Sequence, residues 1–271
     1  MKGLTVQRIV SIIIIFCACI MLTFPATSAA RAQRPAIAAA ADLQFALQEI
    51  AARFQEETGL EVRLSFGSSG NFTHQIAQGA PFELFLSADE NYIFHLAQKG
   101  LTADQGALYA IGRIVLFAPH GSPLRVDESL QDLRAAITDG RIKRFAIANP
   151  EHAPYGRAAQ AALEHETLWK PLSPFLVFGE NASQATQFAA AGTSQGGIIP
   201  LSLSKAPQIS RLGSFALIPA DWHAGEPLRQ RMVLMKTAGD TARKFYHYLQ
   251  QPTARDIFVR FGFLLADEDN H

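Results

Sequence analysis

Four short segments combine glycine, alanine, hydroxyl and amide residues at points where a predicted strand leads into a predicted helix. They are Ala41-Asp42, Gly67-Ser68-Ser69-Gly70, the loop from Asn149 to Gly156, and Gly179-Glu180-Asn181-Ala182. In open α/β sheets, ligands bind beyond the carboxyl ends of strands, where the first N–H groups of a helix lack partners and carry partial positive charge. Two segments fall in each half of the predicted fold, which indicates a cleft around a small solute.

Residues that often take part in catalysis are not arranged for it here. The sequence has no Walker phosphate loop, no Gly-x-Gly-x-x-Gly turn and no His-Glu-x-x-His pair, and its eight histidines show no metal-ligand spacing. An exported enzyme with Asp42 as general base and Ser69 as nucleophile is an alternative, but no neighbouring residue would activate the serine. We therefore expect a binding protein with no catalytic residues and no cofactor.

The composition is that of a folded protein with little attraction for polyanions. Of the 271 residues, 48% are hydrophobic and 18% are charged, which excludes disorder as the main state. Lys plus Arg and Asp plus Glu number 24 each, so no basic excess is available to neutralise a phosphate backbone. Nucleic acid is therefore not an expected partner.

The first 32 residues read as a secretory signal peptide. Lys2 and Arg8 precede an apolar run from Ile9 to Phe24, and a stretch of small residues offers cleavage sites up to Ala32. A membrane anchor is the alternative, although the apolar run is short for a spanning helix, which needs about 20 residues. Both cysteines lie inside this segment, so the mature chain would contain none. We expect a soluble, periplasmic protein without disulfides.

Downstream, apolar alternation typical of strands takes turns with helical periodicity, which predicts an α/β fold. Ten or so strands would make one very wide sheet, whereas two sheets of about five strands are ordinary. We therefore expect two lobes, each a mostly parallel sheet flanked by helices. The predicted lobes are a discontinuous N-terminal lobe of residues 33–117 plus 232–271 and a second lobe of residues 118–231.

At the strand-to-helix junctions the sequence resembles the periplasmic molybdate-binding proteins, the solute-capturing components of molybdate ABC importers. The resemblance covers nearly the whole mature chain, and its most specific part is the stretch from Gly79 to Asp89. The motifs that carry it, in order, are Ala39-Ala40-Ala41-Asp42-Leu43, Phe66-Gly67-Ser68-Ser69-Gly70, Gly79-Ala80-Pro81-Phe82-Glu83-Leu84-Phe85-Leu86-Ser87-Ala88-Asp89, Asn149-Pro150-Glu151-His152-Ala153-Pro154-Tyr155-Gly156 and Phe261-Gly262-Phe263.

The resemblance implies a two-lobed type II periplasmic binding fold that holds molybdate or tungstate in its cleft, is monomeric and docks on a membrane permease. It places ligand contacts at four positions: Asp42, Ser69, Tyr155 through its backbone N–H, and Ala182 through its backbone N–H. Ala41, Ser68 and Asn181 lie in the same junctions and are further candidates. Some members add a tyrosine hydroxyl where this chain has Pro200, which cannot supply one.

Asp42 is the main departure from the family pattern, since many members have serine there. An ionised carboxylate cannot donate to an anion, and like charges about 4 Å apart repel by about 4 kcal/mol at an effective dielectric near 20. Three interpretations stay open. In the first, Asp42 caps the following helix. In the second, Asp42 is protonated, or it joins the coordination of an oxyanion's metal centre. In the third, Asp42, Tyr155 and Glu180 hold a hard cation such as ferric iron, or the site takes another oxyanion.

Overall fold

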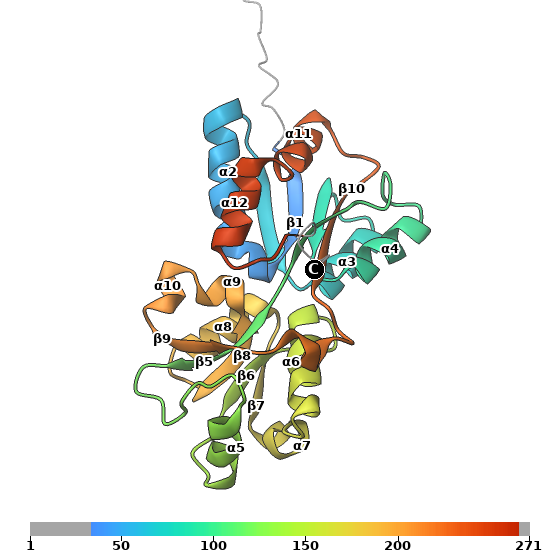
Figure 1. Ribbon diagram of the computed structural model, residues 1–271. Coiled ribbons are helices and arrows are strands. Elements are labelled where there is room, and N and C mark those ends of the chain that lie inside the picture. The colour runs from blue at the N-terminus through green and yellow to red at the C-terminus, as the bar shows by residue number, and fades with distance from the viewer. Residues whose placement is uncertain (1–33, 266–271) are drawn as a thin grey trace, which may run out of the picture. The chain divides into compact units, whose positions relative to one another are not determined.

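The computed structural model describes residues 34–265, so the predicted signal peptide lies outside the described residues. Two five-stranded sheets form the framework, each with helices on both faces (Figure 1). Both sheets are mixed, with two parallel and two antiparallel strand pairs in each, rather than mostly parallel as expected. Among these residues, no helix is long and apolar enough to cross a membrane.

The first sheet has the order β2-β1-β3-β10-β4. Its strands are β1 (Ala36–Ala40), β2 (Arg63–Gly67), β3 (Leu84–Ser87), β4 (Ala107–Ile111) and β10 (Arg229–Leu234). Helices α2 (Gln44–Thr58), α11 (Asp240–Tyr248) and α12 (Pro252–Arg260) cover one face, and α3 (Ser69–Ala77) and α4 (Glu90–Gln98) cover the other (Figure 1).

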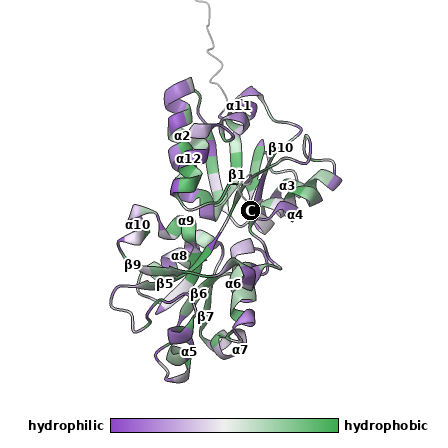
Figure 2. Ribbon diagram, viewed as in Figure 1, coloured by the Kyte–Doolittle hydropathy of each residue, from purple (hydrophilic) through white to green (hydrophobic). Residues whose placement is uncertain are grey.

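The alternation of side chains along β1 explains why both faces of this sheet need cover. Ile37 and Ala39 join the cluster that contains Phe54 of α2, whereas Ala38 joins the cluster that contains Phe72 of α3. All five residues of β1 are buried, as expected of a central strand between two layers. Figure 2 shows the hydrophobic residues gathered on these inner strands.

The second sheet has the order β7-β6-β8-β5-β9. Its strands are β5 (Ile114–Pro119), β6 (Phe145–Ala148), β7 (Leu176–Gly179), β8 (Gly196–Pro200) and β9 (Gly213–Leu217). The accompanying helices are α5 (Gln131–Thr138), α6 (Pro154–His165), α7 (Trp169–Leu172), α8 (Ala182–Ala190), α9 (Leu201–Ser204) and α10 (Pro207–Ser210), with the short 3-10 turns η2 (Ser173–Phe175) and η3 (Ala220–His223).

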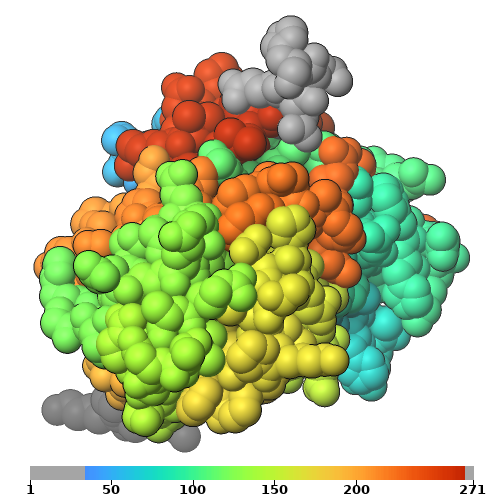
Figure 3. All heavy atoms as spheres, turned by 60° about the horizontal axis from the view of Figure 1, so that its bottom comes forward, coloured from blue at the N-terminus to red at the C-terminus, as the bar shows by residue number. Residues whose placement is uncertain are grey.

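The chain passes between the sheets twice. The first passage is at Gly112 and Arg113, between β4 and β5, and the second runs from the end of β9 to β10. Residues 114–117, which we expected in the first lobe, therefore belong to a strand of the second sheet; the lobe assignment as a whole stays a prediction. On the return path, Trp222 of η3 stacks on His165 of α6 at 5.2 Å, and Figure 3 shows this orange segment against the yellow one.

Gly112 marks the first passage because a side chain does not fit there. A Cβ atom at this position would lie 2.2 Å from the hydroxyl of Tyr155 and 2.9 Å from the amide nitrogen of Gln230. Distances of this size are far inside van der Waals contact. Glycine thus lets the connecting strand pass directly over the side chains that join the two lobes.

Candidate functional site

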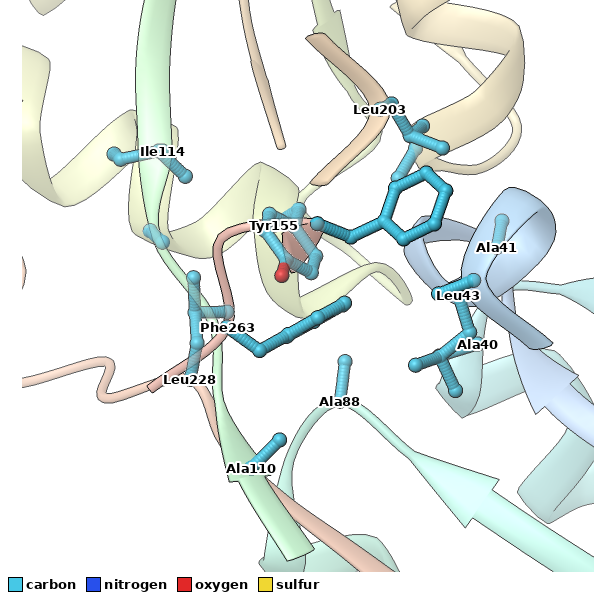
Figure 4. Close-up of a cluster of buried hydrophobic side chains, with 14 of the residues drawn as sticks. Ala40, Ala41, Leu43, Ala88, Ala110, Ile114, Tyr155, Leu203, Leu228 and Phe263 are labelled. Carbon is cyan, nitrogen blue, oxygen red and sulfur yellow. The ribbon is translucent and has the colours of Figure 1, made fainter. Parts of the chain in front are cut away.

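A small pocket lies where the strand-to-helix junctions of the two sheets meet. Six of the seven predicted site residues line it, and the seventh, Asn181, does not. The lining residues are Ala40, Ala41, Asp42, Gly67, Ser68, Ser69, Ala88, Ala153, Pro154, Tyr155 and Ala182. Figure 4 shows the apolar surroundings, in which Tyr155 from the second lobe lies near Ala88 and Phe263. Whether these residues contact a ligand stays a prediction.

Three helix starts bring backbone N–H groups to this pocket. Ser69 is the first residue of α3, Ala182 is the first residue of α8, and Tyr155 is the second residue of α6. In the described part of the chain none of these three N–H groups has an acceptor, because the first turn of a helix provides none. Pro154 has no N–H, so Tyr155 presents the first donor of α6. The pocket therefore combines neutral donors with the positive ends of three helix dipoles.

The two serines of the second junction have different roles. Ser69 is fully buried, and its Oγ accepts a hydrogen bond of 3.0 Å from the N–H of Ala88. Within residues 34–265 its hydroxyl hydrogen has no acceptor, so Ser69 can donate to a guest. Ser68 instead caps α3 by accepting from the N–H of Asn71, and its Oγ lies 3.0 Å from Nδ1 of His152. Asn181 likewise serves as the cap of α8 through the N–H of Gln184.

The predicted role of Asp42 as a helix cap is wrong. Asp42 lies inside a 3-10 turn, η1 (Ala41–Leu43), and neither η1 nor α2 has a side-chain cap in the described structure. Its Oδ2 atom accepts hydrogen bonds from the Tyr155 hydroxyl at 2.9 Å and from the Gln230 amide at 2.6 Å. Its Oδ1 atom is buried and has no partner among the described residues. The carboxyl group thus joins the first lobe to α6 of the second.

Burial dominates the electrostatics of this network. Asp42 is 1% exposed, and desolvation raises its pKa from 3.8 to about 6, although the hydrogen bonds from Gln230 and Tyr155 act in the opposite direction. Burial also raises the pKa of the Tyr155 and Tyr109 hydroxyls well above 10.0, and the nearby Asp42 carboxylate adds to both shifts. The tyrosines therefore stay neutral at physiological pH, whereas Asp42 changes charge close to it.

Charged side chains pair at the rim, away from the pocket lining. Arg157 of α6 reaches across to Asp89 of the first lobe at 2.5 Å and to the Tyr92 hydroxyl at 3.1 Å, and it also pairs with Glu226 at 2.8 Å. Glu180 accepts from the Asn71 amide at 2.6 Å. These contacts hold the two lobes together around the pocket and leave its wall without a cation.

Of the three residues proposed for a hard cation, Asp42 and Tyr155 lie together in the pocket lining, whereas Glu180 lies outside it. The Tyr155 hydroxyl is already donated to Asp42, and Glu180 has a 59% exposed side chain outside the pocket lining. The described residues contain no group of three His, Cys, Asp or Glu side chains placed to hold a metal ion. Pro200, at the end of β8, is also absent from the pocket lining.

We expected the mature chain to lack a Gly-x-Ser-x-Gly motif, and this expectation is wrong. Gly192-Thr193-Ser194-Gln195-Gly196 fits the Gly-x-Ser-x-Gly motif of nucleophile elbows. Here it connects helix α8 to strand β8, the reverse of the strand-to-helix order that the motif requires. Ser194 is 2% exposed and its hydroxyl has no partner within residues 34–265, so no histidine activates it. The motif carries no catalytic site.

Gln230 and Tyr109 are the site residues that sequence reasoning missed. Gln230 is fully buried on β10, donates to Asp42, and accepts from the Tyr109 hydroxyl at 2.7 Å. One sequence signal could have indicated Gln230. It lies between Arg229 and Arg231 in a strand, so its side chain points to the face opposite the two arginines. That pattern favours a buried amide but does not identify its partner, which lies 188 positions away.

Replacing Asp42 with Asn should stabilise the protein at high pH only. The raised native pKa means that folding costs free energy once the carboxyl ionises, by about 3 kcal/mol for a shift of this size. This cost is absent below about pH 4, grows as the pH rises to about 6 and is complete above it. An asparagine carbonyl can accept both existing hydrogen bonds without that charge.

Urea unfolding at about pH 4 and about pH 8 tests this expectation. The control is Glu128→Gln at an exposed acid away from the pocket lining, with an effect within about 0.5 kcal/mol at both values. A stability difference between Asp42→Asn and the unaltered protein that does not change with pH would contradict it.

Comparison with known proteins agrees with this geometry. A family model for bacterial extracellular solute-binding proteins matches residues 35–264. The molybdate-binding protein ModA of Rhodobacter capsulatus is 36% identical over 230 residues, which cover 84% of this chain and 86% of the relative. ModA of Escherichia coli (strain K12) is 32% identical over 232 residues, with coverage of 84% and 87%.

Among solved structures, the periplasmic molybdate-binding protein of Azotobacter vinelandii superimposes with a TM-score of 0.78 and 29% sequence identity, covering 86% of this chain and 99% of that one. On these grounds the chain belongs to the family of bacterial extracellular solute-binding proteins.

Proposed function

We propose that this protein captures molybdate, or the chemically similar tungstate, in the pocket between its lobes and delivers it to the permease of an ABC importer. The observation that carries this proposal is that three helix-start N–H groups, which have no acceptor among the described residues, converge with the Ser69 hydroxyl on one buried pocket. The similarity to molybdate-binding proteins over most of the chain supports it.

The donor set suits a tetrahedral dianion. Removing such an ion from water is costly unless each oxygen receives hydrogen bonds, and bonds from N–H groups to an anion are charge-assisted and strong. Helix starts provide these donors in fixed positions, so little reorganisation accompanies binding. A pocket of rigid neutral donors can thus discriminate by the radius of the ion rather than by its charge alone.

The proposal also covers how the protein closes on its solute, where it acts and what it docks on. The protein acts without a covalent step and without a cofactor, as a monomer whose lobes close on the solute by a hinge motion. The segment of residues 1–32 directs export to the periplasm. The closed rim, with Arg157 bridging to Asp89, then presents a surface formed by both lobes to the membrane permease.

Titration calorimetry of the mature chain tests the ligand directly. We expect heat of binding with molybdate and with tungstate, weaker or no binding with sulfate, and none with ferric citrate. Asp42→Ser, which restores a neutral donor, should preserve or improve oxyanion affinity. Binding of ferric iron alone, lost in Asp42→Ser, would contradict the proposal and favour the cation alternative.

Closure of the lobes can be tested at Gly70. Its N–H donates to the backbone oxygen of His152 across the cleft at 3.0 Å, and a Cβ atom there would lie 2.7 Å from that oxygen. Gly70→Ala should therefore hinder closure and weaken molybdate binding by about tenfold or more, while alanine inside α3 leaves the fold intact.

Gly225→Ala is the control, because no atom lies within 4 Å of a Cβ placed there. The dissociation constants and the melting temperatures of the ligand-free proteins should be measured together. Unchanged affinity in Gly70→Ala would show that this contact does not belong to the binding-competent state.

A further inference from the structure

The two oxygens of the Asp42 carboxyl group have different surroundings. Oδ2 accepts from both the Tyr155 hydroxyl and the Gln230 amide, whereas Oδ1 has no partner within the described chain. The orientation of the Gln230 amide is fixed from its other end, because its Oε1 accepts from the Tyr109 hydroxyl. Oδ2 is thus occupied as an acceptor, and any proton on this carboxyl group must be carried by Oδ1.

Within residues 34–265, no cationic side chain pairs with the Asp42 carboxylate. Of the helices packed against η1, α8 and α9 contain no titratable residue, and the nearest acid along α2 is Glu49, which pairs with Arg260. In β2, Arg63 lies at the end opposite Gly67. The tyrosines of the network stay neutral because burial raises their pKa values.

Around the pocket, the remaining titratable groups are engaged with each other. His152 contacts Ser68 and lies 3.7 Å from Glu180, and Arg157 is shared between two carboxylates and the Tyr92 hydroxyl. On β10, Arg229 and Arg231 pair with Glu90. An ionised Asp42 would therefore face an incoming dianion as an uncompensated like charge.

A proton on Oδ1 reverses this interaction. It removes the negative charge and turns Oδ1, which has no partner among the described residues, into a hydrogen-bond donor. We propose that the site binds the oxyanion together with one proton, taken from solvent and held on Oδ1 of Asp42, which then donates to the bound ion. This inference rests on the proposed function and assigns Asp42 a specific role in it.

Two consequences follow for binding. Above the pKa of the ligand-free carboxyl, affinity should fall about tenfold for each unit that the pH rises, because each binding event must also supply a proton. A ligand with more negative charge is repelled more strongly by an ionised carboxylate, so the affinity for a dianion should depend on pH more steeply than the affinity for a monoanion of similar size.

Calorimetry in buffers of different ionisation heat measures the proton directly. At about pH 7.5, titration of the unaltered mature protein with sodium molybdate should take up close to one proton per molybdate bound. Asp42→Asn should still bind molybdate, with proton uptake near zero and little dependence of affinity on pH. His152→Gln is the matched control for the other titratable group near the pocket and should retain the uptake.

The outcomes separate the two proposals. Molybdate binding without proton uptake in the unaltered protein, or uptake that persists in Asp42→Asn and disappears in His152→Gln, overturns the role of Asp42 and leaves the proposed function standing. Absence of oxyanion binding at every pH from about 5 to about 8 overturns both. The wild-type measurement needs no variant, so a poorly folding variant does not weaken the test.

Discussion

The structure around the pocket depends on one constraint, which is that buried N–H groups need acceptors. Ser69, Tyr155 and Ala182 each present a helix-start N–H to the same small space, and the described residues provide none of them with a partner. Buried backbone donors are rarely left in this state. An anion with several acceptor oxygens would satisfy all three together, and in the proposed function its binding energy and the closure of the lobes then come from the same contacts.

The small residues around the donors follow from this constraint. Alanine and glycine line most of the pocket wall, including Gly67 and Ala88. Their small side chains leave the N–H groups open to a bound anion. The N–H of Ala88 also donates to Ser69 Oγ, so this oxygen already accepts a hydrogen bond and its hydrogen is left to be donated. Asp42 is the exception, since it places an acid in a wall that otherwise consists of neutral donors and small apolar groups.

Much of the fold could be predicted because its signals are local. Helix α2 ends at Gly59, a glycine in the left-handed conformation with φ of 70°, which is a common local stop signal. The alternation of strands and helices was sufficient to predict two sheets. The antiparallel placement of β10 was not predictable, because its partners β3 and β4 lie more than a hundred residues earlier. The first passage between the lobes was placed near Phe117 since no sequence signal separates β4 from β5 except Gly112.

In the candidate site too, features that depend on local sequence could be predicted, and features that depend on long-range contacts could not. The resemblance, carried by local motifs at the strand-to-helix junctions, implied Ser69, Tyr155 and Ala182 as contacts, and all three line the pocket. The partners of Asp42 were not found, because Gln230 and Tyr109 reach it only through the folded chain. The residue that departs from the family pattern was therefore visible in the sequence, whereas the network that explains how its carboxyl group is accommodated was not.

The most direct test of this account is a crystal structure of the mature chain grown with molybdate, with an anomalous difference map recorded at the molybdenum absorption edge. The account predicts a single strong peak in the pocket, with ligand oxygens about 3 Å from the backbone nitrogens of Ser69, Tyr155 and Ala182. A peak at the rim beside Glu180 and His152, or no peak between the lobes, would contradict it.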